Sequence, residues 1–238
     1  MTADAEPGLD ERLWQVWLQA ARGRGVLPAE PVLAQTLDTS RPAVREALVR
    51  LEERGYIHRR RGTDTVVNGA ALDIPARFDS RMDKAELIAA MGHTPDVRVC
   101  GHRIERVSLA EATEFGLAPA TMVLRLTKVW TADGTPAMLA RDSVPLHKRS
   151  DPAESDFARS VFELAPLLAG EPVEWEIVWP DAENLSEADA QMLGRPAGEA
   201  ALSVAVSGLS RSGQVVYWAD ELHVRQAFRY AMVRGSRR

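Results

Sequence analysis

Residues 27–67 constrain the fold more than any other stretch, because two helical patterns, a tight break and a basic hairpin follow one another in order. Apolar residues recur at helical spacing on both sides of a break at 37–40. We expect the hydroxyl of Ser40 to cap the second helix, and Gly55 to end that helix in a left-handed conformation. This order of elements predicts a helix-turn-helix followed by a two-stranded wing.

The second helix and the hairpin carry a concentrated positive charge. Arg41 and Arg45 are four residues apart and therefore project together from the start of the helix. In helix-turn-helix proteins this position meets base edges, where arginine can bind guanine or clamp a phosphate. Residues 40–62 contain seven arginines and three glutamates, a net charge of +4, whereas residues 76–238 have a net charge of −4. A local basic patch on an acidic chain predicts specific binding to double-stranded DNA.

The same segment resembles the winged helix-turn-helix of the GntR family of bacterial transcription factors. The matching motifs are LPAE at 27–30, SRPAVREAL at 40–48, LE at 51–52, GYI at 55–57 and GTDTVV at 62–67. The resemblance implies operator contacts from the second helix and the wing. The residues expected to make these contacts, including the wing arginines that suit phosphate, are Ser40, Arg41, Pro42, Arg45, Arg59, Arg60, Arg61 and Gly62.

Three positions depart from the family pattern. Ala29 replaces the serine that caps the first motif helix, which weakens that cap. Pro31 stands where many members have an arginine that reaches DNA. Asp64 replaces the second glycine of the wing, and its carboxylate brings negative charge toward phosphate. The resemblance therefore implies moderate operator affinity or an unusual operator sequence.

From residue 80 onward the chain alternates between strand and helix patterns, which predicts an α+β fold with an antiparallel sheet. Asp133-Gly134 and Ser212-Gly213 are expected hairpin turns. Helices are expected from Asp79 or Ser80 to Met91, after Ser108, at 157–168 and after Ser186. Strands are expected at 96–107, 122–130, 137–144, 173–179, 200–209, 215–224 and 227–233. We divide the chain into a DNA-binding domain at 1–68, a linker at 69–79 and a second domain at 80–238.

The second domain resembles the UTRA effector-binding domain of the HutC-type branch of the GntR family, whose fold is similar to chorismate lyase. The resemblance is carried by ADGTP at 132–136, by Val144-Pro145 and by the tail from Tyr217 to Tyr230. It implies a small-molecule effector and dimerisation through this domain.

The residues at the family's effector positions differ from those of relatives that sense sugar phosphates. Lys128 and Trp130 stand in place of two arginines, Ala140 in place of a glutamate, and Phe228 in place of a tyrosine. Ser80 matches a serine at a helix start, where an anion can bind. We therefore expect a less anionic, more apolar or aromatic effector, with Lys128 as its charged anchor.

Other classes of site find little support in the sequence. Cys100 is the only cysteine, so a disulfide within the chain is excluded, and we expect it to be buried in a strand. The five histidines lack the spacing of a metal site, and no glycine pattern for binding nucleotides occurs. We expect no cofactor and no catalytic residues. We also expect a cytoplasmic protein, because no signal peptide or membrane span is recognisable.

These observations predict a ligand-responsive transcriptional regulator, expected to be a repressor that binds a palindromic operator as a homodimer. Trp175, Trp179 and Trp218 are expected in the core or at the dimer interface. Two alternatives remain open at this point. One is a lyase-like enzyme, and the other is a DNA-binding regulator with a degenerate effector pocket that answers to a protein partner.

Overall fold

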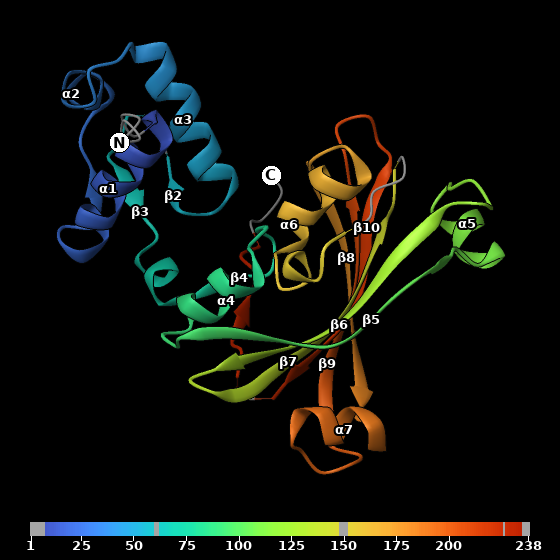
Figure 1. Cartoon of the computed structure of the whole chain (residues 1–238). Coiled ribbons are helices and arrows are strands. Elements are labelled where there is room, and N and C mark those ends of the chain that lie inside the picture. Colours follow the sequence, from blue (N-terminus) through green and yellow to red (C-terminus); the bar gives the residue numbers. More distant parts are fainter. Residues whose placement is uncertain (1–7, 60–61, 148–151, 226, 235–238) are drawn as a thin grey trace. The chain divides into compact units, whose positions relative to one another are not determined.

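The computed structural model describes residues 8–59, 62–147, 152–225 and 227–234. The chain forms two compact units, shown in Figure 1. The first, called here the N-terminal unit, runs up to Asp79 and takes in the segment from Tyr230 onward. The second, called the sheet unit, runs from Ser80 to Arg229. The fold is α+β, as the sequence predicts.

The N-terminal unit contains the expected winged helix-turn-helix. Its elements in order are α1 (Leu9–Arg22), β1 (Val26–Leu27), α2 (Glu30–Thr36), α3 (Arg41–Glu53), β2 (Ile57–His58) and β3 (Thr65–Val67). The three strands pair in the order β1-β3-β2. Ser40 caps α3 as predicted, since its Oγ accepts a hydrogen bond from the amide of Ala43 at 3.3 Å. Ala29 provides no such bond at the start of α2, which confirms the weaker cap.

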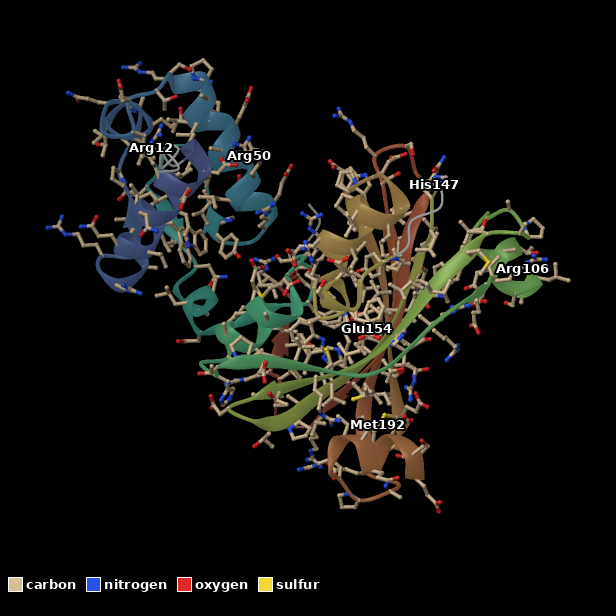
Figure 2. All side chains as sticks on the ribbon, viewed as in Figure 1. Arg12, Arg50, Arg106, His147, Glu154 and Met192 are labelled. Carbon is tan, nitrogen blue, oxygen red and sulfur yellow. The ribbon has the colours of Figure 1, made fainter. Side chains whose placement is uncertain are left out.

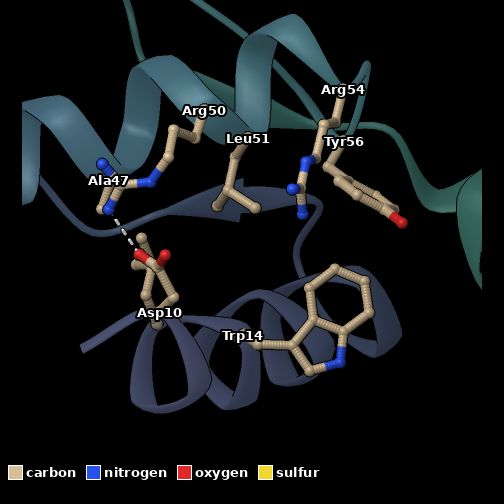
Figure 3. A pocket seen from close by; sticks show the side chains of 8 residues that line it. Asp10, Trp14, Ala47, Arg50, Leu51, Arg54 and Tyr56 are labelled. Carbon is tan, nitrogen blue, oxygen red and sulfur yellow. Dashed lines mark hydrogen bonds and ion pairs between the residues drawn. The ribbon is translucent and has the colours of Figure 1, made fainter. Parts of the chain in front are cut away.

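Packing between α1 and α3 fixes the orientation of the DNA-binding helix. Trp17 is fully buried, stacks on Trp14 at 4.5 Å between ring centroids, and donates to the carbonyl of Tyr56 at 2.8 Å. Figure 3 shows the shallow pocket between the two helices, with Trp14 and Tyr56 on its walls. At its edge Arg50 of α3 pairs with Asp10 of α1 at 2.6 Å. The back of α3 is therefore held by aromatic packing and an ion pair.

The segment expected as a linker is packed against the N-terminal unit. Residues 69–79 form the 3-10 helix η1 (Gly69–Asp73) and the strand β4 (Ala76–Arg77). β4 pairs in parallel with β11 (Tyr230–Ala231), so the strand expected at 227–233 is only two residues long and belongs to this unit. Arg77 is 8% exposed, donates to Asp79 and to the carbonyl of Arg54, and lies over the ring of Tyr56.

The sheet unit is built on one antiparallel sheet of six strands in the order β5-β6-β7-β10-β9-β8. The strands are β5 (Pro95–Arg106), β6 (Met122–Ala132), β7 (Thr135–Pro145), β8 (Trp175–Asn184), β9 (Ala200–Leu209) and β10 (Val215–Val224). The predicted turn at Asp133-Gly134 is confirmed, because both residues have the positive φ that a two-residue hairpin loop of this kind needs.

The helices of the sheet unit are short and mostly capped by side chains. They are α4 (Lys84–Ala90), α5 (Leu109–Glu114), η2 (Glu154–Asp156), α6 (Val161–Leu164), η3 (Ala165–Ala169) and α7 (Glu187–Leu193). Ser108 and Ser186 cap α5 and α7 as predicted. The expected start of α4 at Asp79 or Ser80 is wrong. Asp83 is the cap, and it forms a capping box with Glu86.

The two faces of the sheet have different cover. The inner face carries Lys128 and Tyr217, and it is covered by α4, α6 and η3; side chains fill the space between α6 and the sheet in Figure 2. The opposite face, called the open face, is covered by α5 at one end and by α7 at the other. Cys100 is exposed rather than buried, because the ladder of β5 with β6 is irregular between Val99 and Gly101.

Gly208 of β9 gives a direct test of inner-face packing. A Cβ at this position would overlap the ring of Tyr217, which is buried and donates a hydrogen bond to Glu176. We expect Gly208→Ala to lower the free energy of unfolding by about 1–3 kcal/mol, the usual cost of overpacking. Urea unfolding measures this. Gly101→Ala, in β5 where a Cβ meets open space, is the matched control, and an equal loss in both variants contradicts the explanation.

Candidate DNA interface and effector site

The start of α3 presents the expected DNA-binding residues to solvent. Arg41 is exposed, Pro42 occupies the first turn, and the side chain of Arg45 is 67% exposed. The helix N-terminus adds a positive dipole end, which favours a phosphate nearby. Because Arg41 and Arg45 differ by four positions, both guanidinium groups project from the same side of α3.

Two of the expected DNA-binding arginines have partners within the protein. Arg45 Nη2 lies 2.9 Å from Glu30 Oε2. Arg59 Nε lies 2.9 Å from Glu52 Oε2, and its backbone amide donates to the same carboxylate. Arg60 and Arg61 lie outside the described residues. Gly62 has φ +78°, which makes the wing turn a glycine position.

The inner face of the sheet unit holds a buried cluster of paired charges. Lys84 Nζ, at the start of α4, lies 3.3 Å from Asp142 Oδ1 and 3.0 Å from Glu221 Oε1. Lys128 Nζ lies 3.1 Å from Asp142 Oδ2 and donates to the carbonyl of Arg159 at 2.7 Å. We call these four side chains, Lys84, Lys128, Asp142 and Glu221, the inner-face cluster.

Burial and pairing act in opposite directions on these groups. Burial alone would raise the pKa of Glu221, but Lys84 and His223 outweigh it and hold the pKa at about 2. Burial would likewise lower the pKa of Lys84, but Asp142 and Glu221 raise it above its ordinary value. For Lys128 burial dominates over Asp142 and lowers the pKa. Of the two lysines of the cluster, Lys128 is therefore the one whose charge is less favoured.

Aromatic and polar side chains border the cluster. His223 Nε2 lies 2.8 Å from Glu221 Oε2, and the His223 ring lies 5.0 Å from that of Phe228. Tyr217 donates to Glu176, and burial raises the pKa of Glu176 despite this hydrogen bond. The cluster thus connects β6, β7 and β10 to the start of α4.

The structure places the sequence-predicted effector residues differently with respect to this cluster. Ala140 is directly opposite Lys128 and Glu221 in the ladder. Trp130 is buried, and its Nε1 has no hydrogen-bond partner among the described residues. Ser80 is not at a helix start, and the amide of the first turn of α4 is taken by Asp83, so the anion-binding reason for Ser80 is wrong.

Sequence reasoning missed four members of this region, namely Lys84, Asp142, Glu221 and His223. Each reads locally as an ordinary surface group. A usable signal was nevertheless present, because Asp142, Glu221 and His223 lie in strands that are otherwise largely apolar, and charges in such strands are seldom buried unless they are paired. Across the described ranges no group of three or more His, Cys, Asp or Glu could hold a metal ion. In the same ranges, no helix has the length and apolar character needed to cross a bilayer.

Comparison with known proteins finds a matching family for each of the two units. The family described as "UTRA domain" matches residues 90–229, and the family described as "Bacterial regulatory proteins, gntR family" matches residues 15–67. The HTH-type transcriptional repressor NagR of Bacillus subtilis (strain 168) is 23% identical over 137 residues, which cover 58% of this chain and 56% of NagR. The chain therefore spans little more than half the length of the curated relative that it matches.

Solved structures agree with the fold. The possible transcriptional regulator YydK of Bacillus subtilis has a TM-score of 0.75 at 13% identity, over 96% of this chain and 100% of that chain. PhnF of Mycobacterium smegmatis has a TM-score of 0.59 at 19% identity, over 97% and 100%. A winged helix-turn-helix joined to a UTRA sheet defines a bacterial transcriptional regulator and not an enzyme. The chain belongs to the GntR family, in the HutC-type branch that carries the UTRA domain.

Arg41 tests the DNA interface. We expect Arg41→Ala to weaken binding to an operator duplex by about 1–3 kcal/mol if it contacts a base, and to reduce the salt dependence by about one charge if it contacts phosphate. Fluorescence anisotropy over a salt series separates the two. Arg50→Ala is the control, because Arg50 pairs with Asp10 of α1 at the back of α3. Equal affinities for Arg41→Ala and the wild-type protein would contradict the assignment.

The lowered pKa of Glu221 predicts how the stability of the sheet unit changes at acid pH. Its pKa of about 2 lies below the ordinary value of 4.5, so it contributes stability above pH 4.5 that is lost as the pH falls toward 2. We expect Glu221→Gln to lack this part of the pH dependence, and to be less stable at neutral pH because Lys84 loses a partner. Urea unfolding at a series of pH values measures both effects. Parallel pH profiles for the two proteins would show that the Glu221 pair does not form.

Proposed function

We propose that the protein is a repressor that binds a palindromic operator as a homodimer and leaves it when a small molecule occupies the inner face of the sheet unit. The observation that carries this proposal is the inner-face cluster, which buries four charged side chains beneath α4. Buried charges cost several kcal/mol unless they are paired. Concentrated, perturbed charges of this kind are typical of ligand sites.

The chemistry of the cluster favours an effector with little negative charge. Two lysines already face two carboxylates, so a dianion would compete with Asp142 and Glu221 for the same ammonium groups. Trp130 offers a buried indole N–H that lacks a partner among the described residues, which favours a ligand with a hydrogen-bond acceptor. We infer an apolar or aromatic compound with one acceptor, bordered by Trp130, Ala140 and Phe228. Lys128 completes the proposed set of contacts.

The cluster also suggests how effector binding in the sheet unit could influence the DNA-binding unit. Lys84 follows Asp79, where the N-terminal unit ends, by five residues in the sequence. Glu221 and His223 lie in the last long strand before the chain returns at Tyr230. The pair between Lys84 and Glu221 therefore joins the beginning and the end of the sheet unit at 3.0 Å. An effector that moves α4 acts on both covalent connections to the DNA-binding unit.

The proposed function is tested by selecting a DNA duplex, by screening for a ligand, and by measuring how the two affect each other's binding. A duplex is first selected from a random pool with the full-length protein, and ligands are found by thermal-shift screening of anionic and apolar metabolites. The ligand must then weaken duplex binding, and the duplex must weaken ligand binding by the same factor. A ligand that binds without changing duplex affinity refutes the proposed release. If no metabolite of either set stabilises the protein, the second candidate is favoured, a regulator with a degenerate effector pocket that is controlled by a protein partner.

Lys84 gives the corresponding variant test. We expect Lys84→Met to bind both the selected duplex and the screened ligand, but with a coupling factor close to one instead of the five- to 150-fold range typical of allosteric proteins. Arg195→Met is the matched control, because it removes an ion pair with Glu199 elsewhere in the sheet unit. Melting curves establish that both variants are folded. Undiminished coupling in a folded Lys84→Met protein would rule out this route.

A further inference from the structure

The guanidinium of Arg77 is buried against the end of α3. The side chain is 7% exposed. Its Nε and Nη2 donate to the two carboxylate oxygens of Asp79, and its Nη1 donates to the carbonyl of Arg54 at 2.6 Å. Its Cζ lies over the ring of Tyr56, 4.7 Å from the centroid. The edges and one face of the guanidinium therefore have partners, which is the condition under which a buried charge is tolerated.

The carbonyl of Arg54 belongs to the C-terminal end of α3. Arg54 is the C-cap residue of this helix. The last carbonyls of a helix have no partner within the helix, and they form the negative end of its dipole. A cationic side chain that donates to one of them satisfies it and interacts favourably with the dipole. Arg77 therefore caps α3 from outside the helix, although the two residues are 23 positions apart in the sequence.

Tyr56 connects Arg77 to the aromatic packing that holds α3 on α1. The Tyr56 ring lies 4.8 Å from that of Trp14 and 5.2 Å from that of Trp17, between centroids. Figure 3 shows Tyr56 and Trp14 beside the last turn of α3. Arg77 thus covers the side chain that packs between the end of α3 and α1. A displacement of Arg77 would remove the external cap and uncover Tyr56 at the same time.

Arg77 lies in the short ribbon that β4 and β11 form, called here the connecting ribbon. β4 directly precedes the sheet unit, and β11 directly follows it. The amide of Phe78 donates to the carbonyl of Ala231 at 2.9 Å, and the rings of Phe78 and Tyr230 are 5.2 Å apart. The ribbon also contacts α3 through Val233, whose Cγ1 would lie 2.4 Å from a Cβ at Gly55. Two strands of two residues each are not stable alone, so these contacts hold the ribbon in place.

We propose that Arg77 is a positioning residue for DNA binding, which joins the connecting ribbon to the C-terminal end of α3. Because α3 is a single helix of 13 residues, a constraint at its C-terminal end also sets the direction of its first turn, where Arg41 and Arg45 lie. Both covalent connections to the sheet unit pass through the ribbon. The contact itself is independent of any effector, and its use in regulation rests on the proposed function.

Two simpler roles for Arg77 fit the contacts less well. A direct contact with DNA needs an accessible guanidinium, whereas this one is buried and already engaged by Asp79 and Arg54. A purely local role in the turn after β4 needs only the pair with Asp79. The guanidinium holds the pKa of Asp79 below its ordinary value, so both partners are charged at neutral pH. The local role leaves the bond to the end of α3 without a purpose.

Hydrogen exchange of the full-length protein, without DNA or ligand, tests the contact directly. We expect Arg77→Met to accelerate exchange on the order of tenfold in peptides that cover 51–58 as well as 74–80, since a hydrogen bond from a charged group is lost. Exchange in a peptide from the sheet unit that covers 84–90 should stay as in the wild-type protein. Acceleration confined to 74–80, or spread equally to 84–90, overturns the inference.

Two further variants separate the Arg77 contact from a general loosening of α3. Arg50→Met also removes an ion pair of α3, but its partner is Asp10 of α1, so exchange at 74–80 should not change. Arg77→Lys keeps the charge but cannot bind Asp79 through two donors in a fork, so its exchange should lie between those of the wild-type protein and Arg77→Met. Acceleration at 74–80 in Arg50→Met would overturn the specific role of Arg77.

The positioning role is tested by duplex binding with and without the screened ligand. A merely structural loss would weaken duplex binding by the same factor in both conditions and would leave the coupling factor unchanged. We expect the coupling factor of Arg77→Met to fall close to one while the ligand still binds, and Arg77→Lys to restore part of it. Arg50→Met should keep the wild-type coupling. Undiminished coupling in folded Arg77→Met protein overturns the positioning role.

Failure of this inference is distinguishable from failure of the proposed function. The exchange experiment uses neither duplex nor ligand, so its outcome does not depend on the effector. A wild-type protein that releases no duplex with any ligand contradicts the proposed function, while the exchange at 51–58 still decides whether Arg77 holds the end of α3. A ligand-responsive protein whose exchange at 51–58 is unaffected by Arg77→Met contradicts the role of Arg77 and leaves the proposed function standing.

Discussion

The ion pairs of Lys84 with Asp142 and Glu221 are the interaction on which the inner face of the sheet depends. All three side chains are buried, and each charge would be costly without its partners. Asp142 is shared between Lys84 and Lys128, and Lys84 is shared between Asp142 and Glu221, so the four charges are linked into one network. The same contacts fix α4 on the sheet. The place where the chain enters the sheet unit is thereby set by electrostatics as well as by packing.

Alternation along the strands lets the same sheet present two unrelated surfaces. Arg141 and Asp142 are neighbours in β7, yet Arg141 pairs with Asp189 of α7 on the open face while Asp142 belongs to the inner-face cluster. Asp220 and Glu221 divide in the same way in β10. The period of two lets each strand contribute to the inner-face cluster and to the open face without sharing side chains between them. A shift of one residue in register would exchange the two surfaces, so the hairpin at Asp133-Gly134 is important for both.

Local signals explain which parts of the structure could be predicted from the sequence. Ser40, Ser108 and Ser186 cap helices, and Asp133-Gly134 forms a hairpin turn, because each effect depends on residues within four positions. The start of α4 was placed too early because serine and aspartate at 79–80 resemble the true cap, Asp83. The pairing of β4 with β11 joins segments at opposite ends of the sheet unit, and nothing local specifies it.

The candidate effector site shows a similar limit. Lys128 and Ala140 could be placed because they flank a recognisable hairpin, and the register does set them opposite one another. Lys84, Asp142 and Glu221 come from three separate elements, and only their pairing in space makes burial favourable. The sequence predicts Lys128 as the charged anchor of the effector, and in the structure its ammonium is bound by Asp142 and by the carbonyl of Arg159. An effector at this face must therefore share or displace an existing partner. Since displacing Lys84 would release the start of α4, the residues that hold the inner-face cluster together are also those able to report a bound effector.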